Sequence, residues 1–191
     1  MLLTVKERQK RLAYLGLYTG KIDGKDGKLT KEAYKKLQNK YFTRVSDKDG
    51  IYGKDTDILL RNAYVVELNT RNFDLPEFKC ECGGKYCTGY PTTLSAQLLK
   101  NMQTLRKQYG SITITSGLRC KGFNSILTGS VPTSYHLKGK AVDFACQSSA
   151  TLAGRRQIMK DWKKLASAGY TYCNENGSAP NMGTAIHVQV K

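Results

Sequence analysis

The chain has 191 residues, 40% of them apolar, which is enough for one medium-sized domain or two small ones. It carries 31 basic and 15 acidic residues, and its net charge of +16 favours polyanionic partners such as nucleic acid, anionic polymers or membrane headgroups. No stretch approaches the roughly 18 apolar residues of a membrane span, and no zinc-finger spacing, heptad or RNP-type aromatic motif accompanies the basic charge. We therefore expect neither a membrane nor nucleic acid as partner.

The first residues, MLLTVKERQKRL, contain a run of two leucines and then become charged. They lack the apolar stretch and the small-residue cleavage site of a secretory signal. We therefore expect synthesis in the cytoplasm without a signal peptide.

Three amphipathic helices are predicted within the first 65 residues, in VKERQKRLAYLGLY, LTKEAYKKLQNKYF and DTDILLRNAYVV. Between them the pattern D-G-x-x-G-x-x-T occurs twice, at Asp23–Thr30 and at Asp49–Thr56. We expect both glycines of each copy to adopt positive φ in a tight turn, and Thr30 and Thr56 to cap the helices that follow. Two similar turns without any function would produce the same pattern.

The stretch QKRLAYLGLYTGKIDGKDGKLTKEAYKKLQ resembles the three-helix peptidoglycan-binding domain found in many cell-wall hydrolases. In that family a glutamine-leucine helix, this glycine-containing turn and a second glutamine-containing helix recur in the same order. The resemblance covers about residues 4–65. It implies a small module that docks the chain on peptidoglycan, and it assigns no individual ligand contact.

An α+β arrangement with a central antiparallel sheet is predicted for the rest of the chain. Helices are predicted in TLSAQLLKNMQTLRKQYG, which Gly110 closes, and in LAGRRQIMKDWKKLASAGY. Strands are predicted in SITITSGLRC, GKAVDFAC and TAIHVQVK. We expect a small three-helix domain at residues 1–66, a linker at residues 67–78 and an α+β domain at residues 79–191.

The only two histidines and a nearby carboxylate form a candidate metal site. His136 lies in the loop SYHLKG, Asp143 follows on the strand GKAVDFAC, and His187 lies on the last strand. Two imidazoles and one carboxylate, with a fourth position left for water, are the ligand set of a catalytic zinc site. Bound zinc lowers the pKa of its water to about 7 and polarises a carbonyl group. A packed core histidine and a capping aspartate are the alternative without metal.

The stretch SYHLKGKAVD matches S-x-H-x-x-G-x-A-x-D, the metal motif of zinc D-alanyl-D-alanine carboxypeptidases and related cell-wall endopeptidases. The segments NFDLPEFKCECGGKYC, ITSGLRCKGFN and AIHVQV are similar to the flanking segments of phage and bacterial wall-lytic members, so the resemblance covers about residues 72–191. The zinc ligands that it implies are His136, Asp143 and His187. It also implies that Ser134 and Arg119 lie on the substrate side, where Ser134 holds the metal loop and Arg119 steadies a carboxylate or the oxyanion.

The general base is not identified by this resemblance. Many relatives carry an acidic residue three positions before the last histidine or two positions after it, where this chain has Thr184 and Gln189. Glu175, in the loop NENGSAPNMG, is the candidate base, because a carboxylate suits this role and a loop can bring it to the site. A solvated loop carboxylate is the alternative.

The cysteines suggest a second metal site. Candidate ligands of a structural zinc are Cys80, Cys82, Cys87 and Cys120. Free buried thiols, or bridges formed after release, would also account for them. Cys146 and Cys173 are predicted core residues, and Tyr170 and Tyr172 either line the cleft or pack against the sheet.

Together these features predict a monomeric, endolysin-type peptidoglycan hydrolase, a zinc metallopeptidase that cuts a stem peptide or crosslink containing D-amino acids. Anionic wall polymers add electrostatic attraction, and the protein acts at the bacterial cell wall after phage-type release. The alternative is a wall-binding protein with a weak or inactive peptidase domain, which Thr184 and Gln189 motivate. Nucleic-acid binding explains neither the repeat nor the metal motif.

Overall fold

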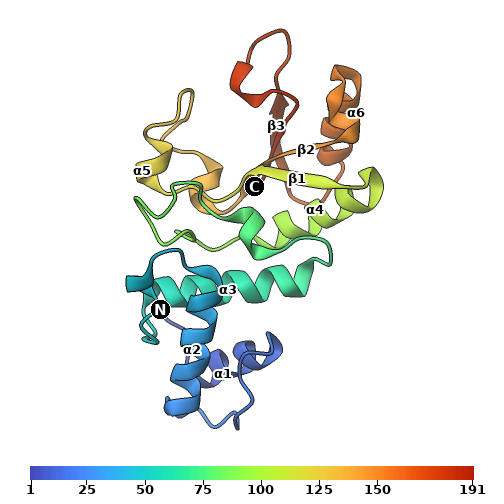
Figure 1. The fold of residues 1–191 in the computed structure, drawn as a ribbon. Coiled ribbons are helices and arrows are strands. Elements are labelled where there is room, and N and C mark those ends of the chain that lie inside the picture. Colours follow the sequence, from blue (N-terminus) through green and yellow to red (C-terminus); the bar gives the residue numbers. More distant parts are fainter.

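Three helices at the N-terminus, followed by a four-stranded sheet with helices packed against it, make up the fold in the computed structural model, which describes residues 1–191 (Figure 1). The N-terminal helices are α1 (Val5–Tyr14), α2 (Lys28–Tyr41) and α3 (Lys54–Asn69). The second part contains α4 (Ala96–Tyr109), β1 (Ile112–Ser116), α5 (Lys121–Asn124), β2 (Ala141–Cys146), α6 (Leu152–Lys163), β3 (Ala168–Cys173) and β4 (Ile186–Val190). The predicted fold class is confirmed. No helix combines the length and the apolar character that a membrane span requires.

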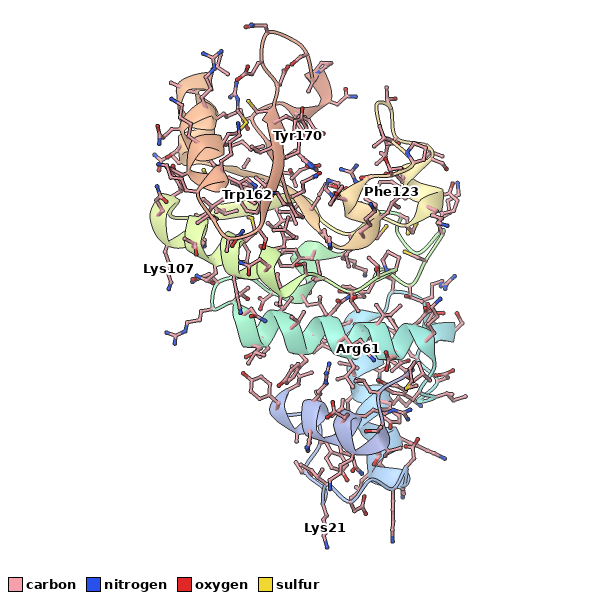
Figure 2. All side chains as sticks on the ribbon, turned by 180° about the vertical axis from the view of Figure 1, so that it is seen from behind. Lys21, Arg61, Lys107, Phe123, Trp162 and Tyr170 are labelled. Carbon is pink, nitrogen blue, oxygen red and sulfur yellow. The ribbon has the colours of Figure 1, made fainter.

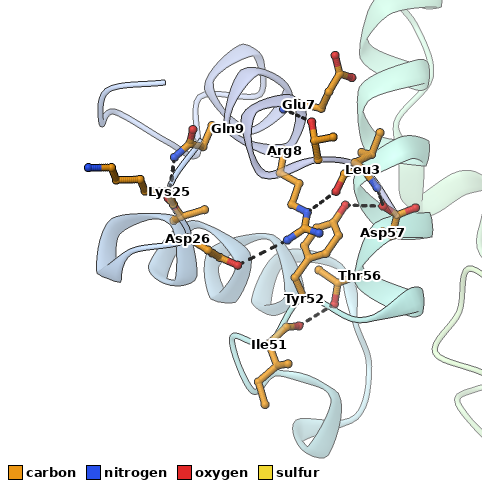
Figure 3. A network of polar contacts seen from close by, with 12 residues as sticks. Leu3, Glu7, Arg8, Gln9, Lys25, Asp26, Ile51, Tyr52, Thr56 and Asp57 are labelled. Atoms are coloured by element: carbon orange, nitrogen blue, oxygen red, sulfur yellow. Dashed lines mark hydrogen bonds and ion pairs between the residues drawn. The ribbon is translucent and has the colours of Figure 1, made fainter. Parts of the chain in front are cut away.

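Each copy of the repeated turn is held by a buried glutamine from the helix before it. The side-chain amide nitrogen of Gln9 lies 3.0 Å from Asp23 Oδ1, 3.1 Å from the Lys25 carbonyl oxygen and 3.2 Å from Thr30 Oγ1, and its oxygen accepts from Gly24 N–H. Gln38 repeats this pattern with Asp49, Gly50, Ile51 and Thr56. Figure 3 shows the Gln9–Lys25 and Ile51–Thr56 contacts. A buried amide without partners costs about 1–3 kcal/mol, so the recurring Asp, Gly and Thr satisfy the glutamine.

The glycines of the repeat have two different roles. The first glycine of each copy has positive φ, +78° at Gly24 and +76° at Gly50. The second glycines, Gly27 and Gly53, have negative φ and are the N-caps of α2 and α3. The prediction that both glycines adopt positive φ is therefore wrong for the second one, because extended backbone at that position starts the helix.

The threonines of the repeat were predicted to cap their helices, but they lie inside the first turn instead. Thr30 and Thr56 are buried, and their hydroxyl oxygens accept hydrogen bonds from Gln9 and Gln38. The buried amide of Gln9 or Gln38 binds the threonine hydroxyl that would otherwise cap the helix. Gly27 and Gly53 occupy the N-cap positions instead.

Helix α3 connects the N-terminal helices to the second part of the chain. It extends to Asn69, beyond the predicted boundary at residue 66. The buried side chain of Asn62 donates to the Thr92 carbonyl (2.8 Å) and accepts from Leu94 N–H (2.7 Å). One cluster of buried apolar side chains runs through both parts. Residues 67–78 therefore include the end of α3 and a 3-10 helix (Leu75–Phe78) with buried side chains, and the domain limits stay a prediction.

The sheet has the strand order β1-β2-β4-β3, and all neighbours are antiparallel. Its apolar core contacts include Ile158 and Trp162 of α6, both fully buried, as predicted from the helical pattern (Figure 2). Strand β3 was not predicted, because its residues read as the continuation of α6. The helix ends at Lys163, and Ser167 adopts positive φ (55°). Pairing with β4 then determines the extended conformation, which is a long-range effect that local propensity does not contain.

Candidate metal centre

The structure brings His136, Asp143 and His187 together from three elements: a 3-10 helix (Tyr135–Lys138), β2 and β4. Asp143 and His187 are direct partners in the antiparallel register, so their side chains lie on the same face of the sheet. The 3-10 helix ends at Gly139, whose φ is +65° and where a Cβ would clash with the Thr93 carbonyl. Glycine is thus required for the turn that places His136 next to β2.

The ligand atoms of the three residues converge. Asp143 Oδ1 lies 2.7 Å from His187 Nδ1 and 3.3 Å from His136 Nε2, and the two imidazole nitrogens are 3.3 Å apart. All three side chains are buried. All three ligand atoms lie within 4.8 Å of one another. This is the donor set of a three-ligand metal site with room for a further ligand.

Each imidazole is oriented by a second hydrogen bond on its other nitrogen. His136 Nδ1 lies 2.7 Å from the Gly117 carbonyl oxygen, and His187 Nε2 lies 3.3 Å from Gln189 Oε1. Both acceptors require an N–H on that nitrogen, which leaves Nε2 of His136 and Nδ1 of His187 free to accept a metal. Gln189 therefore orients a candidate ligand.

Arg119 contacts the carboxylate of the centre. Its guanidinium donates to Asp143 Oδ2 at 2.7 Å and to Ser116 Oγ at 3.1 Å. Asp143 thus presents Oδ1 to the imidazoles and Oδ2 to the arginine. This contact was not predicted, because Arg119 was assigned to the substrate alone.

The protonation states match those of metal ligands. Burial acts to raise the pKa of Asp143, but the two imidazoles that face its carboxylate, His136 and His187, outweigh it and hold the pKa below its usual range. Burial lowers the pKa of His136, against the opposing effect of Asp143. An ionised carboxylate and a neutral imidazole are the forms that coordinate a metal, so the residues fit a divalent ion such as zinc.

A cleft of about 1100 Å³ adjoins the centre at Asp143, which lines it, whereas His136 and His187 are absent from its lining. Asp143, Arg119 and Tyr172 line it, and residues 126–130 and 178–185 contribute from the segments after α5 and β3. Tyr172 also stacks on His187, with ring centroids 4.7 Å apart, whereas Tyr170 is exposed. Of the two predicted alternatives, lining the cleft therefore applies to Tyr172.

The structure does not bring every predicted site residue to the cleft. Glu175 is absent from the cleft lining, and its carboxylate accepts from Arg156 Nε at 3.1 Å. Ser134 precedes the 3-10 helix of His136, but its side chain makes no capping hydrogen bond. Its carbonyl accepts from Leu137 N–H. The loop is thus held through the backbone of Ser134, and the predicted roles of both side chains in substrate handling and catalysis find no contact in the structure.

Glu81 is the carboxylate that the sequence analysis missed. It lines the same cleft as Asp143 and Arg119, and no further Asp or Glu lines it. Partial burial raises the pKa of Glu81, with Arg119 acting in the opposite direction. The sequence feature that could have pointed to Glu81 is its position between Cys80 and Cys82, two of the candidate metal-binding cysteines.

The four candidate cysteines also converge. Their sulfur atoms lie within 4.8 Å of one another, and all six cysteines of the chain are unbridged. A hydrogen bond with Cys87 lowers the pKa of the Cys80 thiol to about 5. Cys173 is a buried core residue, as predicted, and Cys146 is partly buried against the core.

Comparison with known proteins relates both parts of the chain to described families. Residues 3–57 match a family model described as a peptidoglycan binding domain. Residues 71–176, more than half of the chain, match the model described as Peptidase M15. This match includes His136 and Asp143 and ends before His187. The comparison with curated proteins gave no match. The chain carries a peptidoglycan-binding domain at its N-terminus and belongs to the peptidase M15 family.

Proposed function

We propose that the chain is an endolysin-type, zinc-dependent peptidoglycan peptidase that acts at the bacterial cell wall. The observation that supports this most directly is the convergence of one carboxylate oxygen and two imidazole nitrogens beside a cleft, in a peptidase-family chain with a peptidoglycan-binding domain. Proposed ligands of the zinc ion are His136, Asp143 and His187. When bound, zinc at such a site lowers the pKa of its water to about 7 and polarises the scissile carbonyl.

We assign separate roles to the residues around the centre. Gln189 and the Gly117 carbonyl orient the two imidazoles, and Arg119 holds Asp143. We assign the general base to Glu81, because it is the carboxylate, other than the proposed ligand Asp143, that lines the cleft. A carboxylate in this position can accept a proton from the attacking water and return it to the leaving amine.

The proposed substrate is a stem peptide or crosslink that contains D-amino acids. A cleft of about 1100 Å³ between two loops exceeds a pocket for a single small molecule and suits a peptide. The Arg119 guanidinium, which lines this cleft, can also attract a peptide carboxylate. Trimming of a terminal D-alanine and opening of a crosslink are both compatible with this geometry.

Defined muropeptides should be cleaved by the zinc-loaded protein, and a chelator should stop the cleavage. Mass spectrometry of the products identifies the bond that is cut and separates carboxypeptidase from endopeptidase activity. Re-addition of zinc after chelation should restore cleavage, which excludes unfolding as the cause. If the protein sediments with cell walls but releases no fragment with or without zinc, the alternative of a wall-binding protein without peptidase activity replaces this proposal.

We propose further that anionic wall polymers contribute to docking through α2. Lys28, Lys31 and Lys35 follow one another at helical spacing, and they line a groove of about 640 Å³ between the two repeated turns, which Asp26, Glu32 and Asp49 also line. These side chains are exposed. Because three carboxylates of the groove offset these lysines, the proposed attraction rests on their exposed ammonium groups together with the net charge of +16.

The double change K31E/K35E should weaken binding to purified walls by about tenfold at low salt, since exposed charges contribute up to about 1 kcal/mol each. The difference should shrink as ionic strength rises. The matched control K100E/K107E makes the same charge change on the exposed face of α4. Equal losses in both double variants, measured by sedimentation with walls, would show that net charge rather than the groove determines docking.

A further inference from the structure

The cysteine cluster joins two segments that are distant in the sequence. Cys80, Cys82 and Cys87 lie in one loop, and Cys120 lies at the N-terminus of α5. The four sulfur atoms lie within 4.8 Å of one another, and the Cys82–Cys87 pair is 3.5 Å apart. Four thiolates at about 2.3 Å from one zinc ion are about 3.8 Å apart in a tetrahedron. The spacing of the cluster therefore matches a four-thiolate site.

Backbone N–H groups already point at three of these sulfurs. Cys120 N–H lies 3.4 Å from Cys80 Sγ, Gly89 N–H lies 3.4 Å from Cys87 Sγ, and Phe123 N–H lies 3.4 Å from Cys120 Sγ. Such donors stabilise thiolates and orient them as ligands. Positive φ at both residues of the Gly83–Gly84 pair lets the loop between Cys82 and Cys87 fold back on itself.

The arrangement does not resemble two separate disulfide pairs. Cys80 accepts from the backbone N–H of Cys120, Cys87 contacts Cys82, and all four sulfurs lie within 4.8 Å of one another. Each sulfur therefore faces a common centre. Buried thiols that act only as small apolar groups would not require four converging sulfurs with N–H donors on three of them.

The cluster is also connected to the candidate active centre. Glu81 lies between two of the cysteines and lines the cleft. Arg119, which precedes Cys120, donates to Asp143, and Gly117 on the same segment accepts from His136. Leu118 N–H donates to the Phe78 carbonyl, so the two segments already run side by side. An ion held by the four sulfurs would fix both segments at the rim of the cleft.

We propose that Cys80, Cys82, Cys87 and Cys120 bind a structural zinc ion that holds Glu81 and Arg119 in place at the cleft. The metal site stands on the geometry of the sulfurs alone, and its coupling to activity rests on the proposed function. The thiol protons leave on metal binding, and no oxidant or reductant is needed.

The test measures metal content in the full-length chain, purified without added reductant and exposed to zinc. Elemental analysis should find two zinc ions in the unaltered protein, one in C82S and one in H136A. Cobalt substitution of H136A should produce the intense thiolate charge-transfer bands of a sulfur site, and the same experiment on C82S should not. The control variant C146S, which changes a cysteine outside the cluster, should keep both ions.

Several results would overturn the proposal. One is a C82S variant that retains as much zinc as the unaltered protein, and another is an H136A variant that retains none. A third is fewer than six alkylated cysteines after unfolding with chelator under non-reducing conditions, which would show bridges in their place. If C82S fails to fold, the cobalt spectrum of H136A alone shows whether the four cysteines bind a metal ion.

The coupling to the cleft has a separate readout. C82S that keeps the zinc of the His136 centre should lose about 10- to 100-fold in turnover, the range for a disturbed outer shell. Undiminished turnover with one zinc lost would leave a structural ion but refute its role in positioning Glu81 and Arg119. Loss of muropeptide cleavage in the unaltered protein would refute the proposed function without affecting the count of two zinc ions.

Discussion

Replacing His136 by alanine should abolish zinc retention at the histidine-aspartate centre and stop muropeptide cleavage, while binding to cell walls stays unchanged. The substitution leaves Asp143 and His187 as the remaining ligands. Loss of an outer-shell partner alone lowers metal affinity about 10- to 100-fold, so loss of a ligand should exceed that range. Metal analysis, product release and sedimentation with walls measure the three properties separately.

The exposed neighbour Lys138 provides a control within the same 3-10 helix. Lys138→Ala should retain zinc and activity, because its side chain lies over the Tyr135 ring and does not contact the centre. If H136A keeps full turnover, the three residues are not the catalytic metal site, and the function proposed above is wrong.

Replacing Glu81 by glutamine should lower kcat by about 10²- to 10⁴-fold, the contribution typical of a general acid or base. Glutamine has nearly the same shape but cannot accept a proton. Zinc content and wall binding should therefore stay at the level of the unaltered protein. Turnover of a defined muropeptide, measured together with metal content, separates a lost base from a disturbed cluster.

The parallel change Glu175→Gln decides between the two carboxylates. Glu175 pairs with Arg156 outside the cleft, so its replacement should change kcat by less than about twofold, the scale of a surface pair. The opposite outcome, in which E175Q loses turnover and E81Q does not, would show that the loop after β3 moves to the centre and that the sequence-based assignment was correct.

The three residues of the candidate metal centre could be predicted because two of them lie in one local motif. His136 and Asp143 are separated by a short loop that contains the required Gly139 and by the first residues of β2. The chain contains a single further histidine. Strand alternation also placed His187 on the face opposite Ile186 and Val188, both of which are buried in the structure. Which atoms converge, Oδ1, Nε2 and Nδ1, became visible with the register of β2 and β4.

The repeated turn shows a different limit. The pattern D-G-x-x-G-x-x-T was recognised, and its first glycine behaves as expected. The reason for the pattern lies outside it, in Gln9 and Gln38 of the preceding helices, whose buried amides require the Asp, Gly and Thr atoms as partners. The threonines were misassigned as caps because local propensity does not include a partner from another helix.

The sequence by itself determined the fold class, the two-part organisation suggested by its motifs, and the identity of the candidate ligands, because these depend on periodicity, on short motifs that resemble known families, and on the presence of only two histidines. The tertiary structure decided the existence of β3, the contact of Arg119 with Asp143, and the place of Glu81 rather than Glu175 in the cleft. Each of these depends on a contact between segments that are far apart along the chain. Such contacts form only when strands pair and loops pack, and no local pattern of residues encodes them.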